Sequence, residues 1–260
     1  MNEVNKTLYI PLYGKSYVSK KGIILNDPTS ETVWNSAGFA LKGKSKSKWL
    51  AYYMGMRARV FDDWLLSQMN ENEDAVVIHV GCGLDSRINR VGSLGHLWYD
   101  VDFPEVIEER KKYYSEDSHY HMISADVSHE GWIGAMPRAK KAIVVMEGVS
   151  MYLTFGQLSA FVSDLCSHFD SLSLLVDCYT TFAAKMSKIK NPVNDVGVTT
   201  VYGIDDPKTV EAAGITFINE RQITPNCLIN ELSGMEKAIF SRLYAGKTSK
   251  KLYRLYEFKK

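Results

Sequence analysis

Two glycines that follow a short apolar run, Gly81 and Gly83, are the clearest sign of ligand chemistry in the sequence. The run AVVIHV at residues 75–80 leads directly into Gly-Cys-Gly, which is typical of a buried parallel strand that ends at a loop. Glycines at such a loop let the backbone approach a bound ligand closely. The dinucleotide fingerprint GxGxxG is incomplete, because Ser86 stands where its third glycine would be. A nicotinamide-dependent oxidoreductase is therefore disfavoured.

A carboxylate follows this loop at the spacing expected for a ribose contact. Asp102 ends the sequence WYDVD, 21 residues after Gly81, and an acid about 20 residues past a glycine loop can bind both ribose hydroxyls. Asp100 competes for this role, because the two-residue alternation of a strand places both acids on one face. We favour Asp102 because it lies nearer the strand end. Its alternative role is that of a solvated turn residue before Pro104.

Two further acids follow strand-like segments. Asp126 lies in SADVS, where a carboxylate can accept a hydrogen bond from an exocyclic adenine amine, and a capping or turn role is the alternative. Glu147 directly follows the apolar run 142–146, where a charge is costly unless it is paired. A ligand ammonium would be a suitable partner for it. Because ligands of open α/β sheets bind at the carboxyl ends of the strands, these motifs predict one common site.

The segments around these motifs predict a doubly wound α/β sheet, a Rossmann-like fold with helices on both faces. Expected strands cover residues 75–80, 97–101, 119–124, 142–146, 172–178 and 252–258. Expected helices cover residues 49–69, 84–95, 104–115, 154–169, 207–213 and 232–243. Thr154 is a suitable N-cap for one of them. Residues 180–230 are less regular.

The composition excludes several classes of protein. With 31 basic and 30 acidic residues the net charge is +1, which gives no general footprint for nucleic acid. No apolar run approaches the roughly 18 residues of a membrane span, and the N-terminus lacks a signal core, so a cytoplasmic protein is expected. The four cysteines lack metal spacing, and the HxH of His119 and His121 has no nearby third ligand, so no metal is expected.

Four motifs in the middle of the chain resemble those of one known family. VGCGLDSR, WYDVDFPEVIEERK, SADV and MEGVSMYL are similar to the motifs of the leucine carboxyl methyltransferase and polyketide O-methyltransferase family. The resemblance is strong in the middle third, weak around RARVFDD in the first predicted helix, and nearly absent after residue 180. It implies a class I methyltransferase that uses S-adenosylmethionine and releases S-adenosylhomocysteine.

The resemblance also implies which residues bind the cofactor: Arg57, Gly81, Gly83, Asp102, Asp126, Val127 and Glu147. The glycine loop would line its methionine part, and Asp102 would hold its ribose. Asp126 and Val127 would flank the adenine. Glu147 would face the amino group and Arg57 the carboxylate, at opposite poles of the cofactor's amino-acid end.

Neighbouring charged residues leave an alternative to this assignment. Arg59 is the rival of Arg57, because the matching segment could be shifted by two residues. Asp85 and Arg87 are expected to be structural, as an ion pair or a cap that holds the glycine loop. No catalytic residue is identified, although Tyr152 could either face the transfer site or be a packing residue.

The chain is expected to form one methyltransferase domain in four parts: an N-terminal helical lid at 1–70, a cofactor-binding core at 75–178, a substrate-side insertion at 180–230, and a C-terminal helix and strand at 231–260. Four lysines at 42–48 alternate with glycine and serine. They indicate a solvated loop or, alternatively, a lid segment near a ligand.

The expected reaction is methylation of a hydroxyl or carboxyl oxygen on a small, polyketide-like molecule, with no nucleic-acid or membrane partner. A carboxylate acceptor needs no base, whereas a phenol or alcohol needs proton removal by a nearby His, Asp or Glu. The alternatives are a protein C-terminal carboxyl methyltransferase and a NAD-type oxidoreductase on a similar fold.

Overall fold

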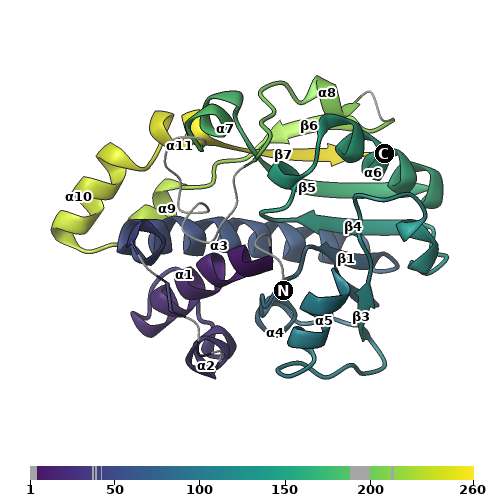
Figure 1. Ribbon diagram of the computed structural model, residues 1–260, viewed down its shortest axis with the longest axis horizontal. Helices are drawn as coiled ribbons and strands as arrows, with labels where there is room; N and C mark the ends of the chain where they lie inside the picture. Colours follow the sequence, from purple (N-terminus) through teal and green to yellow (C-terminus); the bar gives the residue numbers. More distant parts are fainter. Residues whose placement is uncertain (1–4, 37, 39, 42, 188–199, 212–213) are drawn as a thin grey trace.

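The computed structural model describes the whole chain except residues 1–4, 37, 39, 42, 188–199 and 212–213. Within the described residues, a seven-stranded sheet has the order β3-β2-β1-β4-β5-β7-β6 (Figure 1). The strands are β1 (Val76–Val80), β2 (Trp98–Asp102), β3 (Tyr120–Ser124), β4 (Lys141–Met146), β5 (Ser171–Tyr179), β6 (Thr216–Glu220) and β7 (Tyr253–Lys259). Strands β1 to β5 run parallel, and β7 is antiparallel to β5 and β6.

The central strands are apolar because the sheet is covered on both faces. Every residue of β1 is buried, as is nearly every residue of β4 and β5. The chain leaves β1 toward β2 and β3 on one side, then crosses back to β4 and β5 on the other. This reversal beside β1 creates the crevice at the carboxyl ends of the strands in which α/β proteins bind ligands.

Helices cover both faces of the sheet, as predicted (Figure 1). One core cluster joins α1, α3 and α4 to one face, and a second joins η3, α6 and α8 to the other. None of the helices in the described ranges is both long and apolar enough to cross a membrane. The described helices are η1 (Asn5–Leu8), α1 (Tyr9–Lys20), α2 (Pro28–Ser36), η2 (Gly43–Lys46), α3 (Lys48–Glu71), α4 (Arg87–Val91), α5 (Pro104–Arg110), η3 (Trp132–Ala135), η4 (Ser150–Tyr152), α6 (Phe155–His168), α7 (Thr181–Ser187), α8 (Lys208–Glu211), α9 (Asn226–Ile229), α10 (Gly234–Leu243) and α11 (Lys247–Leu252).

A helical N-terminal region was expected and is present, but the helices α1 and α2 were not assigned individually from the sequence. The sequence of α1 contains Gly14, which normally weakens a helix, and Pro11, which is tolerated because it lies in the first turn. Tertiary packing explains Gly14: a Cβ atom there would lie 2.7 Å from Cβ of Met54 on α3. The reciprocal contact is at Gly55, where a Cβ would lie 2.8 Å from Val18. These glycines let α1 and α3 pack closely, which places both helices at the crevice.

The other differences from the predicted elements are mainly in length. The helices predicted at 84–95 and 104–115 are shorter, as α4 and α5, and Thr154 caps α6 with a capping box completed by Gln157. Strand β6 was missed because it is a mostly exposed edge strand with no clear apolar alternation. The substrate-side insertion predicted at 180–230 includes residues 188–199 and 212–213, which lie outside the described residues.

Candidate active site

A cavity of about 730 Å³ opens at the carboxyl ends of β1, β2 and β4. Its wall continues over α1 and α3 on one side and over η4, α7 and the α10–α11 region on the other. The seven residues predicted to bind the cofactor all line this cavity: Arg57, Gly81, Gly83, Asp102, Asp126, Val127 and Glu147. Segments far apart in the sequence therefore meet where the topology reverses.

Both glycines of the loop adopt a backbone conformation that favours glycine, and at Gly81 there is also no room for a side chain. Gly81 has φ +65° and Gly83 has φ +52°, in the left-handed region that favours glycine. A Cβ atom at Gly81 would lie 2.1 Å from Cγ2 of Val149, which follows β4. The loop can therefore pass close beneath the residues after β4, and its backbone forms part of the cavity floor.

Asp102 rather than Asp100 faces the cavity. The Asp102 carboxylate accepts hydrogen bonds from the backbone N–H groups of Gly83 and Phe103, each at 2.8 Å. Burial raises the pKa of Asp102 to about 6, although these two N–H donors oppose the rise. Asp100 is fully buried and does not line the cavity; its carboxylate is bound by side chains of His79, Trp98, Arg110 and Tyr120.

Asp126 and Val127 form the wall beyond β3. Asp126 accepts hydrogen bonds from the backbone and side chain of Ser128 at 2.9 and 2.6 Å, and it pairs with His129 at 2.8 Å. Burial opposes ionisation of Asp126, but these partners lower its pKa below the usual range. Asp126 is thus a turn residue with local partners that also lines the cavity, and its contact with an adenine stays a prediction.

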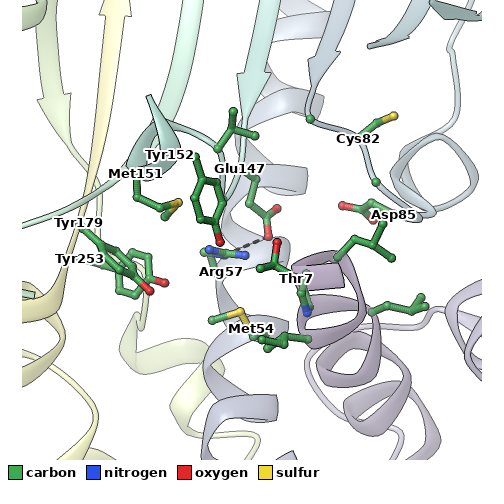
Figure 2. Close-up of a pocket in the computed structure, with 18 of the residues that line it drawn as sticks. Thr7, Met54, Arg57, Cys82, Asp85, Glu147, Met151, Tyr152, Tyr179 and Tyr253 are labelled. Carbon is green, nitrogen blue, oxygen red and sulfur yellow. Dashed lines mark hydrogen bonds and ion pairs between the residues drawn. The ribbon is translucent and has the colours of Figure 1, made fainter. Parts of the chain in front are cut away.

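Arg57 and Glu147 form a buried ion pair, with 3.0 Å between Arg57 Nε and Glu147 Oε1 (Figure 2). Their contact with the two ends of a cofactor's amino-acid group stays a prediction, but the direct pair between them was not expected from the sequence. The physical reason is that a buried carboxylate at the end of an apolar strand requires a cation, and Arg57 projects from α3 across the end of β4 to supply one. The guanidinium of Arg57 uses Nε and Nη1 for its carboxylate partners.

Two partners of this pair were not identified from the sequence. Arg57 Nη1 donates to Asp177 of β5 at 2.7 Å, and Arg87 Nη2 donates to the second oxygen of Glu147. Although burial opposes it, Arg57 and Arg87 hold the pKa of Glu147 well below its usual range. An acid inside the apolar run LSLLVDC was the signal that Asp177 requires a buried cation.

The neighbouring charged residues have structural roles, as expected for Asp85 and Arg87. Arg87 lies 3.5 Å from Asp85 and also binds Asp62 of α3, while Asp85 pairs with Lys15 of α1 at 2.9 Å. This network fixes the glycine loop to both helices. Arg59, the rival of Arg57, points away from the cavity and pairs with Asp63 on its own helix.

The rest of the cavity wall is mainly apolar and includes several aromatic and sulfur-containing side chains. Figure 2 shows Tyr152, Met151, Tyr179 and Tyr253 on one side of Arg57, with Met54 on α3 below it. Such a surface binds flat apolar groups through area and ring contacts. Lys44 of η2 also lines this part, so the lysine-rich segment includes a short helix at the cavity rather than only a solvated loop.

No general base for proton removal is evident in this apolar part. Among the described lining residues, the histidine and the carboxylates lie on the strand-end side: His79, Asp85, Asp102, Asp126 and Glu147. Tyr152 does line the cavity, but burial raises its phenol pKa, which makes it a hydrogen-bond donor rather than a base at neutral pH. Among the described residues, no three His, Cys, Asp or Glu side chains are grouped to hold a metal ion.

A comparison with models of known protein families finds a match over more than half of the chain. Residues 13–165 match the family model of leucine carboxyl methyltransferase. This range contains all seven predicted cofactor-binding residues and ends within α6.

Comparison with characterised sequences and solved structures gives relatives that cover most of the chain. The tetracenomycin polyketide synthesis O-methyltransferase TcmP of Streptomyces glaucescens is 31% identical over 184 residues, which is 70% of this chain and 68% of that protein. The S-adenosyl-L-methionine-dependent methyltransferase dpfgK of Gibberella zeae is 24% identical, over 79% of this chain and 77% of that protein. The magnesium protoporphyrin IX methyltransferase of Synechocystis PCC 6803 shares the fold, with a TM-score of 0.52, 13% identity, and coverage of 95% of this chain and 97% of that one.

Proposed function

The chain belongs to the leucine carboxyl methyltransferase family, and from this premise we propose that it methylates an oxygen of a small, largely apolar acceptor with S-adenosylmethionine as donor. The observation that carries the proposal is the single cavity in which a polar, strand-end part adjoins an aromatic and methionine-lined part. A volume of about 730 Å³ lies in the upper part of the range for small-molecule sites, roughly 300–1,000 Å³. Donor and acceptor can therefore occupy it together.

The strand-end residues fit an adenosyl amino acid in shape and charge. The Asp102 carboxylate faces the cavity with only two backbone donors, which leaves lone pairs for the two ribose hydroxyls. Asp126 and Val127 would flank the adenine. Glu147 would accept from the amino group, and Arg57 Nη2 would donate to the carboxylate, so both ends of the zwitterion would bind one buried ion pair rather than two separate groups.

The protein's own contribution to transfer is alignment and exclusion of water. When bound, the donor supplies a methyl group that is already electrophilic because it is attached to a sulfonium sulfur. The cavity holds the acceptor oxygen in line with that methyl group, which converts an encounter between two molecules into a step within one complex. The oxygen forms the new bond to carbon, and the electron pair of the broken bond remains on sulfur.

The acceptor is proposed to be a small aromatic or polyketide-like molecule with a reactive hydroxyl or carboxyl group. The aromatic and methionine side chains support this class, and the relative from Streptomyces glaucescens is named as a polyketide O-methyltransferase. With no base among the described residues of the apolar part, an acceptor oxygen that is ionised in water is the simplest partner.

Incubation with methyl-labelled S-adenosylmethionine and a panel of acceptors tests this function. The panel contains polycyclic phenols, aromatic carboxylic acids and a peptide with a free C-terminal leucine. We expect label on at least one aromatic acceptor and none on the peptide. Label on the peptide alone would favour the protein carboxyl methyltransferase, and tight NAD binding without any response to S-adenosylhomocysteine would favour the oxidoreductase.

The affinity for S-adenosylhomocysteine is expected to fall as pH decreases through about 6. Asp102 has its pKa raised to about 6 in the folded protein, and only its ionised form accepts hydrogen bonds from both ribose hydroxyls. The affinity should be constant from pH 7 to 8 and about tenfold weaker at pH 5, since each pH unit below the pKa is worth about 1.4 kcal/mol. Titration calorimetry at four pH values measures this.

Asp102→Asn is the matched control for this pH dependence. The amide has the same shape and does not titrate, so the affinity of this variant for S-adenosylhomocysteine should be low and nearly constant from pH 5 to 8. A variant with the same pH slope as the wild type would contradict the assignment.

The stability of the wild-type protein changes with pH in the opposite sense to its affinity. Ionisation of Asp102 disfavours the folded state as pH rises from about 4 to about 6, because the pKa of Asp102 is higher in the folded protein than in the unfolded chain.

A further inference from the structure

Three segments at the cavity carry a concentration of positive charge. Residues 43–50, 179–187 and 241–253 contain eight Lys or Arg and no Asp or Glu, although the whole chain has a net charge of only +1. The remaining chain has 23 basic against 30 acidic residues. Each of the eight lines the cavity or lies within two residues of one that does, and we call them the basic rim: Lys44, Lys46, Lys48, Lys185, Arg242, Lys247, Lys250 and Lys251.

Most of the basic rim is exposed and without an acidic partner. Lys48 pairs with Glu236 at 2.9 Å, and Lys250 pairs with Glu220 at 3.4 Å. In the described part of the chain, the other six make no ion pair, and all eight side chains are exposed. Six like charges on segments that line the cavity create a positive potential that extends roughly a Debye length, about 8 Å at physiological ionic strength.

Helix α3 connects this rim to the predicted transfer site. Arg57, Met54 and Leu50 line the cavity at helical spacing, followed toward the amino end by Ser47 and Lys44. At 1.5 Å per residue, the distance along α3 from Arg57 to Lys48 is about 14 Å. The apolar part of the cavity is therefore elongated, with a polar pair at one end and Lys44 at the other.

The charge of the rim does not suit the methyl donor. S-adenosylmethionine has a sulfonium and an ammonium group against one carboxylate, so it is a net cation, and a positive rim opposes its entry. The rim does suit an anionic acceptor, since opposite charge raises the local concentration and the association rate. A neutral apolar acceptor would gain nothing from six exposed cations.

We propose that the acceptor is an elongated aromatic anion, whose acidic group is held by Lys44 at the outer end of the cavity while its other end reaches the strand-end residues. The aromatic body lies along α3 against Met54 and Tyr53, and the basic rim attracts the anion from solution. This inference rests on the proposed function for the location of the donor. It adds an anchoring residue, Lys44, and a charge requirement for the substrate.

Acid and amide pairs of equal size test the proposal. The protein is saturated with S-adenosylhomocysteine and titrated with 2-naphthoic acid, 2-naphthamide, anthracene-2-carboxylic acid and its amide. We expect each acid to bind about tenfold or more tightly than its amide, in the range of a charge-assisted hydrogen bond. In Lys44→Met, this preference should fall below threefold while the affinities of the amides and of S-adenosylhomocysteine stay within twofold.

Lys208→Met is the matched control, because it removes the same charge from an exposed site on α8, away from the cavity wall. It should keep the wild-type preference for acids. Raising the NaCl concentration from 50 to 500 mM should weaken the binding of the acids and leave the binding of the amides unchanged.

Several results would overturn the proposal. One is equal binding of acids and amides to the S-adenosylhomocysteine complex; a second is an acid preference that Lys44→Met leaves intact, which would place the anion at Arg57 instead. Failure of both acids to bind at millimolar concentration would also overturn it. In each of these cases the donor site stands. Failure of S-adenosylhomocysteine itself to bind would reject the proposed function together with this inference.

Discussion

Asp102→Ala is expected to weaken binding of S-adenosylhomocysteine by about 1.5–3 kcal/mol, roughly ten- to a hundredfold, while the protein stays folded. The structure explains the size of this loss in affinity, because the Asp102 carboxylate faces the cavity and accepts hydrogen bonds from only two backbone N–H groups. Removal of a group whose folded pKa is raised by burial should not destabilise the fold at neutral pH. Titration calorimetry gives the affinity, and thermal unfolding gives the stability.

Asp100→Asn is the control, because a substitution of the other candidate acid, two residues away, should have the reverse pattern. Asp100 is fully buried and bound by Arg110 and His79, so its loss should cost about 3–5 kcal/mol of unfolding free energy by leaving the buried Arg110 cation uncompensated. Folded Asp100→Asn protein should bind S-adenosylhomocysteine within about threefold of the wild type. If Asp100→Asn lost the affinity and Asp102→Ala did not, the ribose contact would have been assigned to the wrong acid.

Arg57→Lys and Glu147→Gln are expected to weaken the binding of S-adenosylmethionine far more than the binding of adenosine, which lacks the amino-acid group. The loss for S-adenosylmethionine should be about ten- to a hundredfold, and that for adenosine below threefold. Lysine keeps the positive charge of Arg57 but cannot bind Glu147, Asp177 and a ligand carboxylate together. Competition binding with both ligands measures the ratio for each variant.

Stability must be measured in the same variants, because the pair also holds the fold together. Glu147→Gln leaves Arg57 and Arg87 short of a buried carboxylate, so we expect a lower melting temperature. Arg59→Lys is the matched control, since Arg59 is on the same helix but outside the cavity. It should change neither the ratio of the affinities for S-adenosylmethionine and adenosine nor the melting temperature. Equal losses for adenosine and S-adenosylmethionine in folded protein would mean that the pair is only structural.

The core elements were predictable because the apolar pattern decides them. Strands β1, β4 and β5 are short apolar runs, and such runs are buried whatever their neighbours are. Helix α1 was not assigned individually, since its Gly14 opposes a helix locally and only contact with Met54 of α3 explains the glycine. Strand β6 pairs at the sheet edge through its backbone, which leaves little pattern in its side chains.

The candidate site was predictable in its members and not in its contacts. Topology alone brings Gly81, Asp102 and Glu147 to one edge of the sheet, because parallel strands end on the same side. The pairing of Arg57 with Glu147 joins residues 90 positions apart, and it depends on how α3 crosses the end of β4. Asp177 could have been suspected as an acid in an apolar run, but the sequence does not indicate which cation would reach it.

A crystal structure of the protein with S-adenosylhomocysteine tests the central claim most directly. We expect one molecule per chain at the carboxyl ends of β1, β2 and β4, with both ribose hydroxyls on Asp102 and the amino-acid group between Glu147 and Arg57. Its sulfur should face the part of the cavity lined by Tyr152 and Met54, leaving the space along α3 toward Lys44 open. A ribose held elsewhere, or an amino-acid group without contact to Arg57 or Glu147, would contradict the account.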